Sequence, residues 1–280
     1  MNLQVYMGHC LWAIIFVLNW NLVMPQVDSK DLHLTFEEKT TLDKFKQQVI
    51  NVLPEEFMKS DFYLIRWLRA RNWDIPAAKT MLFDNLKWRK ENKIKSILQE
   101  DWSDLEQDFP ASFSTTDKMS RPIITMEMGD WDFRAAVLTG KAQRLNRYLI
   151  YTIERYVNSV FEAQAAGRNV TRVLVLVDLE GFSLRKHACP LCIPILIRWT
   201  ATMESYYPQF TNEIIVINAP TTITVPFNSI KPLMSQDTRD QFQIFGTDKQ
   251  QWVKYLDSKV DRSQRTQRYG GTKPLLQISS

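Results

Sequence analysis

Two short runs of β-branched apolar residues, separated by a segment of helical length, constrain the fold of this 280-residue chain more than any other feature. The first run spans 173–178 and the second spans 214–218, and each ends in a polar residue. The apolar segment 188–202 lies between them and is long enough for a crossover helix. Because near-continuous apolar strands are typical of parallel sheets covered on both faces, this part of the chain is predicted to form a βαβ unit of an α/β fold.

Residues 35–100 are expected to form a small helical subdomain. Apolar side chains recur at helical spacing after Ser60 and after Pro76, and basic side chains lie between them. The basic set comprises Arg66, Arg69, Arg71, Lys79, Lys87, Arg89, Lys90 and Lys93. Such a helix pair could bind phosphates of nucleic acid or of lipid, or could be a solvated face. The net charge of +4 is too small to indicate nucleic acid, so no nucleic-acid partner is expected.

The remaining pattern adds elements before and after the βαβ unit. Residues 120–127 and 241–246 read as strands, 139–166 as a long helix and 252–260 as a short one. Residues 261–280 are polar and are expected to be loosely held.

Residues 225–234 are too apolar for an ordinary surface helix. Pro226 suits a helix start, and Lys231 lies among apolar neighbours, where its ammonium must reach water or meet an anion. The segment is either buried core, which the residues alone favour, or the cover of an apolar cavity that touches membrane when it moves.

The N-terminal region contains an apolar run, Leu11–Leu18, that has the length of the apolar core of a signal peptide and is too short to span a bilayer. No Lys or Arg precedes it, and no clear cleavage site follows before Pro25. A cleaved signal, a membrane-interface anchor and an extension that never packs remain the alternatives.

Sequence motifs of enzymes are weak in this chain. Gly140-Lys141 lacks the other glycine and the hydroxyl residue of a phosphate-binding loop, so Asp178 is interpreted as a turn former at a strand end. There is no Gly-x-Ser-x-Gly elbow and there are only three histidines. The chain is therefore not expected to be an enzyme.

His187 precedes a Cys-x2-Cys pair, Cys189 and Cys192, that could hold zinc or act in redox chemistry. A structural zinc needs four ligands, and the other histidines are far away in the sequence. The favoured interpretation is two buried, small apolar side chains, with no metal and no cofactor.

A set of short motifs resembles the CRAL-TRIO lipid-binding family over residues 35–272. The motifs are Ile65-Arg-Trp-Leu-Arg-Ala-Arg71, Lys87-Trp-Arg-Lys90, Val177-Asp-Leu-Glu-Gly181, Tyr206-Tyr-Pro208, Ile217-Asn-Ala-Pro220, Ile230-Lys-Pro232, Ile244-Phe-Gly246 and Tyr269-Gly-Gly271. Within the family, the resemblance is greater to the animal supernatant protein factor (tocopherol-associated) group than to the yeast phosphatidylinositol transfer group. That group continues into a β-sandwich, which is not expected here because the sequence ends at Ser280.

The resemblance implies a helical subdomain over 35–100 and an α/β lipid-binding domain over 101–272, between an extension (1–34) and a tail (273–280). The sheet would floor an apolar pocket lined by Tyr156, Val173, Val175, Val177, Ile215 and Ile217. Residues 225–234 would act as a gate helix through Val225, Phe227, Ile230 and Met234. A lipid headgroup or a membrane surface would meet Arg71, Lys231, Thr238 and Arg239.

Departures from the family pattern bear on the ligand. Val173 and Val175 stand where phosphatidylcholine-binding members have hydroxyl residues, and Gln209 and Gln241 replace an expected Glu and Lys of the inositol-phosphate site. Burying a phosphate without partners costs several kcal/mol. We therefore expect a tocopherol-, sterol-precursor- or isoprenoid-like ligand that a non-enzymatic monomer carries between membranes. The alternative is a regulatory sensor that binds phosphatidylinositol or phosphatidylcholine without net transfer.

The expected location is cytoplasmic, with transient binding to a membrane surface. If residues 1–25 are a cleaved signal peptide, the protein is secreted instead.

Overall fold

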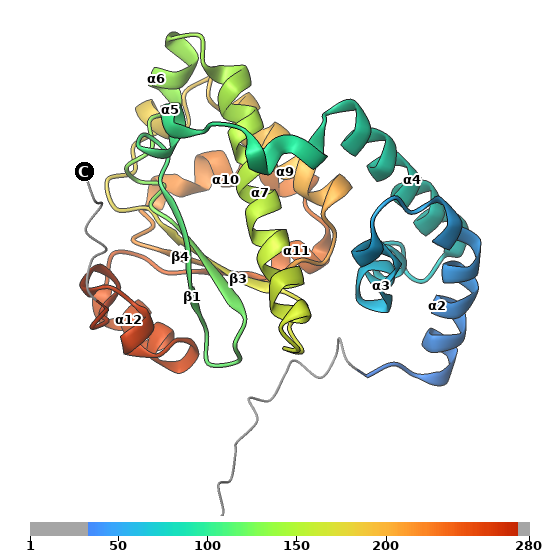
Figure 1. Cartoon of the computed structure of the whole chain (residues 1–280). Coiled ribbons are helices and arrows are strands. Elements are labelled where there is room, and N and C mark those ends of the chain that lie inside the picture. The colour runs from blue at the N-terminus through green and yellow to red at the C-terminus, as the bar shows by residue number, and fades with distance from the viewer. Residues whose placement is uncertain (1–32, 274–280) are drawn as a thin grey trace, which may run out of the picture.

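A helical part precedes a mixed α/β part in the computed structural model, which describes residues 33–273 (Figure 1). The helical part contains α2 (Phe36–Val49), α3 (Asp61–Arg69) and α4 (Ile75–Glu91), with 3-10 turns at Ile50–Val52, Glu56–Lys59 and Ile94–Gln99. The side chains of Thr35, Ser60 and Asp74 accept a backbone N–H at the start of these three helices. The predicted helical N-terminal part is confirmed.

One sheet of five strands organises the rest of the described chain. Its strands are β1 (Ala111–Thr116), β2 (Pro122–Met126), β3 (Val173–Asp178), β4 (Thr211–Ile217) and β5 (Phe242–Ile244), and their spatial order is their chain order. β1 is antiparallel to β2, and every other pair is parallel. The predicted βαβ unit is therefore confirmed. β1 was not predicted, because it is a polar edge strand whose side chains are at most partly buried and therefore show no apolar pattern.

Helices cover both faces of this sheet. They are α5 (Ser103–Glu106), α6 (Phe133–Leu138), α7 (Ala142–Ala165), α8 (Leu184–His187), α9 (Ile193–Tyr206), α10 (Thr224–Ile230), α11 (Gln236–Asp240) and α12 (Lys249–Lys259). Further 3-10 turns lie at Thr221–Ile223, Lys231–Leu233, Arg262–Gln264 and Gln267–Tyr269. The crossover helix α9 begins later than predicted, because residues 189–192 form a turn closed by a disulfide.

The two faces of the sheet belong to two cores. The larger core joins one face to α7, α9 and the helical part of the chain. On the other face, strand residues pack against α12 and the chain that follows it. The members of this second core are Ile123, Leu174, Leu176, Ile215, Ile217, Trp252, Leu256, Val260 and Tyr269.

The segment after α12 is firmly docked, so the prediction of a loosely held tail from residue 261 is wrong up to Lys273. Arg265 and Tyr269 are buried, and the Arg268 Nε donates to Oδ2 of the buried Asp178 at 2.6 Å. Asp178 also accepts from the Glu180 backbone N–H at 2.9 Å, as expected of a turn former. The contacts that hold this segment reach strands far away in the sequence, which local polarity does not reveal.

None of the helices between residues 33 and 273 is long and apolar enough to cross a membrane. The apolar run Leu11–Leu18 lies outside the described residues.

Candidate functional site

A cavity of about 490 Å³ lies between one face of the sheet and the helices α7, α9 and α10. Its floor is made by Val175 and Val177 of β3 and by Ile214 and Val216 of β4. These residues pair across the two strands, Val175 with Ile214 and Val177 with Val216, and paired residues of parallel strands face the same side. A smooth, branched apolar floor follows directly from the strand sequences.

The structure divides the predicted pocket residues into three groups. Tyr156, Val175 and Val177 line the cavity. Val173 is fully buried in the larger core but does not line the cavity. Ile215 and Ile217 face the opposite side of the sheet, against α12, so the prediction that they line the cavity is wrong. Their neighbours Ile214 and Val216 line it instead. The run 214–217 is apolar throughout, and its sequence therefore carries no alternation that would reveal which residues face the cavity.

The predicted gate segment lies over the cavity rather than in the core. Phe227, Ile230 and Met234 line the cavity, and the Phe227 ring meets the Phe242 ring edge to face at 5.3 Å. Val225 lies on the outer side of α10 and is 50% exposed. The residues alone favoured buried core, and that interpretation is wrong, because one side of the segment faces solvent.

Exposed and half-buried polar side chains line one part of the cavity, which we call its mouth. Arg71, Gln209, Thr238 and Gln241 all line it, and the Gln209 Nε2 donates to the Asp237 Oδ2 at 2.9 Å.

Two of the predicted surface residues lie outside the cavity lining. The Arg239 guanidinium donates to the Gln236 Oε1 at 2.9 Å, and Lys231 is exposed. Within the part of the chain that the structure describes, Lys231 takes part in no ion pair. The four predicted headgroup or membrane residues are thus divided between the mouth and the outer surface.

A polar network behind the cavity joins α4 of the helical part to α7 and to the residue that follows α9. The Arg89 guanidinium donates to both oxygens of Glu154, at 2.6 and 3.1 Å, and the Tyr207 hydroxyl donates to the same carboxylate at 2.6 Å. Burial, and to a smaller extent the charge of Glu154, raises the pKa of Tyr207 well above its ordinary value. Arg66, also buried, donates to the backbone carbonyls of Gln209 and Thr171. Two members of the predicted basic face are therefore interior, structural residues.

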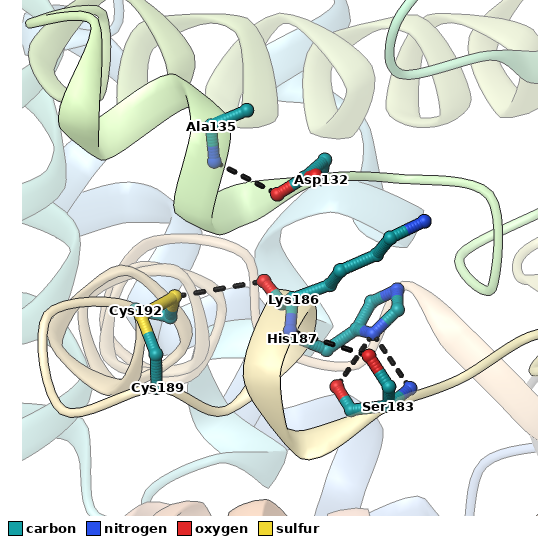
Figure 2. Close-up of a disulfide and its surroundings, with 7 residues drawn as sticks. All are labelled: Asp132, Ala135, Ser183, Lys186, His187, Cys189 and Cys192. Carbon is teal, nitrogen blue, oxygen red and sulfur yellow. Dashed lines mark hydrogen bonds between the residues drawn. A yellow bond between two sulfur atoms is a disulfide. The ribbon is translucent and has the colours of Figure 1, made fainter.

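A disulfide joins Cys189 and Cys192 at the start of α9 (Figure 2). The favoured interpretation as two apolar thiols is wrong, although Cys192 is fully buried as expected. Among the described residues, no group of three or more His, Cys, Asp or Glu side chains is arranged to hold a metal.

Among the cavity residues that sequence reasoning missed are His187, which it weighed as a metal ligand, and Trp199, which it did not consider. His187 and Trp199 line the cavity, and each has a ring nitrogen without a hydrogen-bond partner among the described residues. The sequence signal that could have indicated these two residues was their position in the apolar crossover that follows β3.

Comparisons with known proteins agree with this architecture. The family model "CRAL/TRIO domain" matches residues 106–271, and "CRAL/TRIO, N-terminal domain" matches residues 41–84. The crystal structure of Sfh5 superposes with a TM-score of 0.68 at 18% identity, covering 87% of this chain and 91% of that one.

Curated relatives match over most of this chain. "Protein real-time" of Drosophila pseudoobscura pseudoobscura is 28% identical over 204 residues, which is 70% of this chain and 30% of the relative. The protein of the same name from Anopheles gambiae is 31% identical over 186 residues, 65% of this chain and 27% of the relative. A CRAL-TRIO domain-containing protein of Caenorhabditis elegans is 28% identical over 193 residues, 68% of this chain and 27% of the relative.

The chain thus spans about a third or less of the length of these relatives. The CRAL/TRIO match alone extends over more than half of the chain and includes the sheet, the cavity floor and the helix above it. This chain belongs to the CRAL/TRIO family of lipid-binding proteins.

Proposed function

We propose that the cavity binds one hydrophobic lipid of the tocopherol, sterol-precursor or isoprenoid class and that the protein carries it between membranes without chemical change. The observation that carries this proposal is the floor of the cavity. Val175, Val177, Ile214 and Val216 offer methyl groups and no hydrogen-bonding group to a ligand.

Apolar burial alone is strong enough to hold such a ligand. The cavity volume of about 490 Å³ lies within the usual range for small-molecule sites. Burying about 300 Å² of an isoprenoid at about 25 cal/mol per Å² yields on the order of 7 kcal/mol before the cost of association is subtracted. Reversible carriage therefore requires no covalent step.

A phospholipid fits this floor less well. Val175 stands where phosphatidylcholine-binding family members have a hydroxyl residue, so a phosphate near β3 would lose its hydration without gaining a partner there. At the mouth, Gln209 and Gln241 supply neutral amides in place of an acid and a base.

Release requires the gate segment to move, and its outer side suits contact with a membrane. Val225 and Leu233 are 50% and 39% exposed, and Lys231 lies close to them in the chain. As the segment leaves the cavity, its apolar side chains would pack against lipid tails instead of the protein, while the ammonium would favour an anionic surface by about 1 kcal/mol.

The second candidate function is a sensor that binds phosphatidylinositol or phosphatidylcholine and presents it to a partner. Arg71 and Thr238, which match residues of the family's inositol-phosphate site, both lie at the mouth and favour this alternative.

Vesicle-to-vesicle transfer distinguishes the two functions. Donor vesicles would contain labelled squalene or labelled phosphatidylcholine, and transfer to acceptor vesicles would be measured with the full chain. Val216→Trp fills the cavity from its floor, whereas Leu138→Trp adds bulk at a site on α6 that is 58% exposed. We expect transfer of squalene by the parent and by Leu138→Trp, and loss of transfer in Val216→Trp. Transfer of phosphatidylcholine in preference to squalene, or binding without transfer, would contradict the carrier function.

A further inference from the structure

The lining of the cavity includes two aromatic residues that each have a ring nitrogen without a hydrogen-bond partner among the described residues. These nitrogens are the Nε2 of His187 and the Nε1 of Trp199, and each is buried. Both residues line the cavity, and His187 is only 2% exposed. A buried polar group that lacks a partner is destabilising, so a ligand that supplies the partner gains affinity.

The His187 ring is held so that Nε2 remains available to a ligand. Its Nδ1 lies 3.0 Å from the backbone nitrogen of Ser183 and 2.9 Å from the backbone oxygen of the same residue. The ring stacks on Phe182 at 4.8 Å and meets the edge of Phe133 at 6.4 Å. Figure 2 shows Nδ1 turned toward Ser183 and the other ring nitrogen turned away from it. Backbone and aromatic contacts together fix the imidazole before any ligand arrives.

One aromatic cluster connects the two nitrogens. The ring centroids of Trp199 and Trp131 are 6.4 Å apart, those of Trp131 and Phe133 are 5.8 Å apart, and Phe133 contacts His187. Phe133, His187 and Trp199 of this cluster line the cavity, and we call the part that they line its inner end. The charged residues that line the cavity lie instead on α3 and just after it, near the end of α9 and on α11; they are Arg69, Arg71, Glu204 and Asp237.

The donor and acceptor chemistry of the inner end selects a neutral oxygen. The Trp199 N–H can only donate. The His187 Nε2 donates or accepts according to the tautomer, because Nδ1 faces both a backbone N–H and a backbone carbonyl. A hydroxyl both donates and accepts, so it satisfies either tautomer. A carboxylate or phosphate would bring a charge to an end of the cavity whose described lining includes no Lys or Arg, and burying an unpaired charge is unfavourable.

We propose that this inner end is a subsite for the hydroxyl group of a neutral lipid alcohol, which enters the cavity hydroxyl first and leaves its hydrocarbon part over the β3–β4 floor. This inference rests on the proposed function, since it requires that the cavity binds an apolar lipid. It narrows the ligand class from isoprenoids in general to isoprenoid alcohols.

The test is a matched pair of ligands: phytol, a branched C20 alcohol, and phytane, the corresponding hydrocarbon. Binding of each to the delipidated full chain is measured by native mass spectrometry and by displacement of a fluorescent fatty probe. We expect the parent to bind phytol about tenfold more tightly than phytane, which corresponds to about 1.4 kcal/mol. His187→Phe keeps an aromatic ring between Phe182 and Phe133, and it should weaken phytol binding about tenfold and so remove the preference for phytol over phytane.

Two further variants test the subsite in case His187→Phe does not fold, which would show as the loss of a cooperative melting transition. His187→Gln retains a polar group and should keep part of the preference for phytol, whereas Trp199→Phe should reduce that preference. Equal binding of phytol and phytane by the parent would overturn the subsite and leave the carrier function standing. Binding of neither ligand by a parent that retains phospholipid would overturn both.

Discussion

On one face of the sheet, Ile215 and Ile217 pack against Trp252 and Leu256 of α12, and on the other face their neighbour Val216 floors a cavity of about 490 Å³. The side chains of the two faces are chemically alike. What differs is the covering element: α12 lies directly on the strands, whereas α10 and the wall formed by α9 leave space above them. The packed face holds the sheet together, and the opposite face is therefore free to take a ligand.

Replacement of Arg268 is predicted to have the largest effect on the stability of the packed side. Asp178 is fully buried, and Arg268→Met would leave its Oδ2 without the guanidinium that now lies 2.6 Å away. We expect a loss of about 3 kcal/mol in the free energy of unfolding, measured by urea denaturation. The control is Arg262→Met, which removes an exposed partner of Asp257 and should lower the free energy of unfolding far less. Equal losses in the two variants would contradict the structural role of Arg268.

Neighbouring residues of β4 test the contrast between the faces directly. Ile215→Ala removes side-chain volume from a close-packed core and should cost about 2–4 kcal/mol. Ile214→Ala removes the same atoms from a side chain that already borders the cavity, so we expect about 1 kcal/mol. Denaturation of both variants under the same conditions gives the difference. If Ile214→Ala costs as much as Ile215→Ala, the region above Ile214 is packed and not open.

The disulfide at the start of α9 should contribute modestly. It closes a loop between residues three apart in sequence, for which the chain-entropy estimate is about 2 kcal/mol. A double variant, Cys189→Ser with Cys192→Ser, should lower the melting temperature and leave lipid binding unchanged. Loss of a redox activity in this variant would instead support an enzyme built on the pair.

Charge on the outer side of the gate should have the smallest effect. Lys231→Glu is expected to slow transfer to anionic vesicles at least fivefold, since losing one basic residue near a membrane removes about 1 kcal/mol of attraction and the new carboxylate is repelled. Lys254→Glu makes the same charge change on α12, behind the packed face, and should leave the transfer rate unchanged. Equal transfer rates for Lys231→Glu and the parent would show that Lys231 does not contribute to membrane contact.

Local sequence patterns predicted the apolar strands and the longest helices, but not the polar edge strand β1 and not the contacts between elements. The β-branched runs predicted β3 and β4, and helical spacing predicted α7, because these signals depend on neighbouring residues. Which residues of β4 face the cavity depends on register, and a uniformly apolar strand does not encode it locally. The docked C-terminal segment depends on the contact of Arg268 with Asp178, ninety residues earlier. The role of His187 emerges only when its ring is seen fixed beside a cavity.

Native mass spectrometry with lipid extraction, on the full chain purified from a eukaryotic cell, tests the central claim most directly. We predict one neutral isoprenoid-type lipid bound per protein, with the bound fraction greatly reduced in Val216→Trp and retained in Leu138→Trp. Phosphatidylcholine or phosphatidylinositol as the main bound lipid would contradict this claim, because the cavity floor would then accommodate a phosphate that its residues offer nothing to bind.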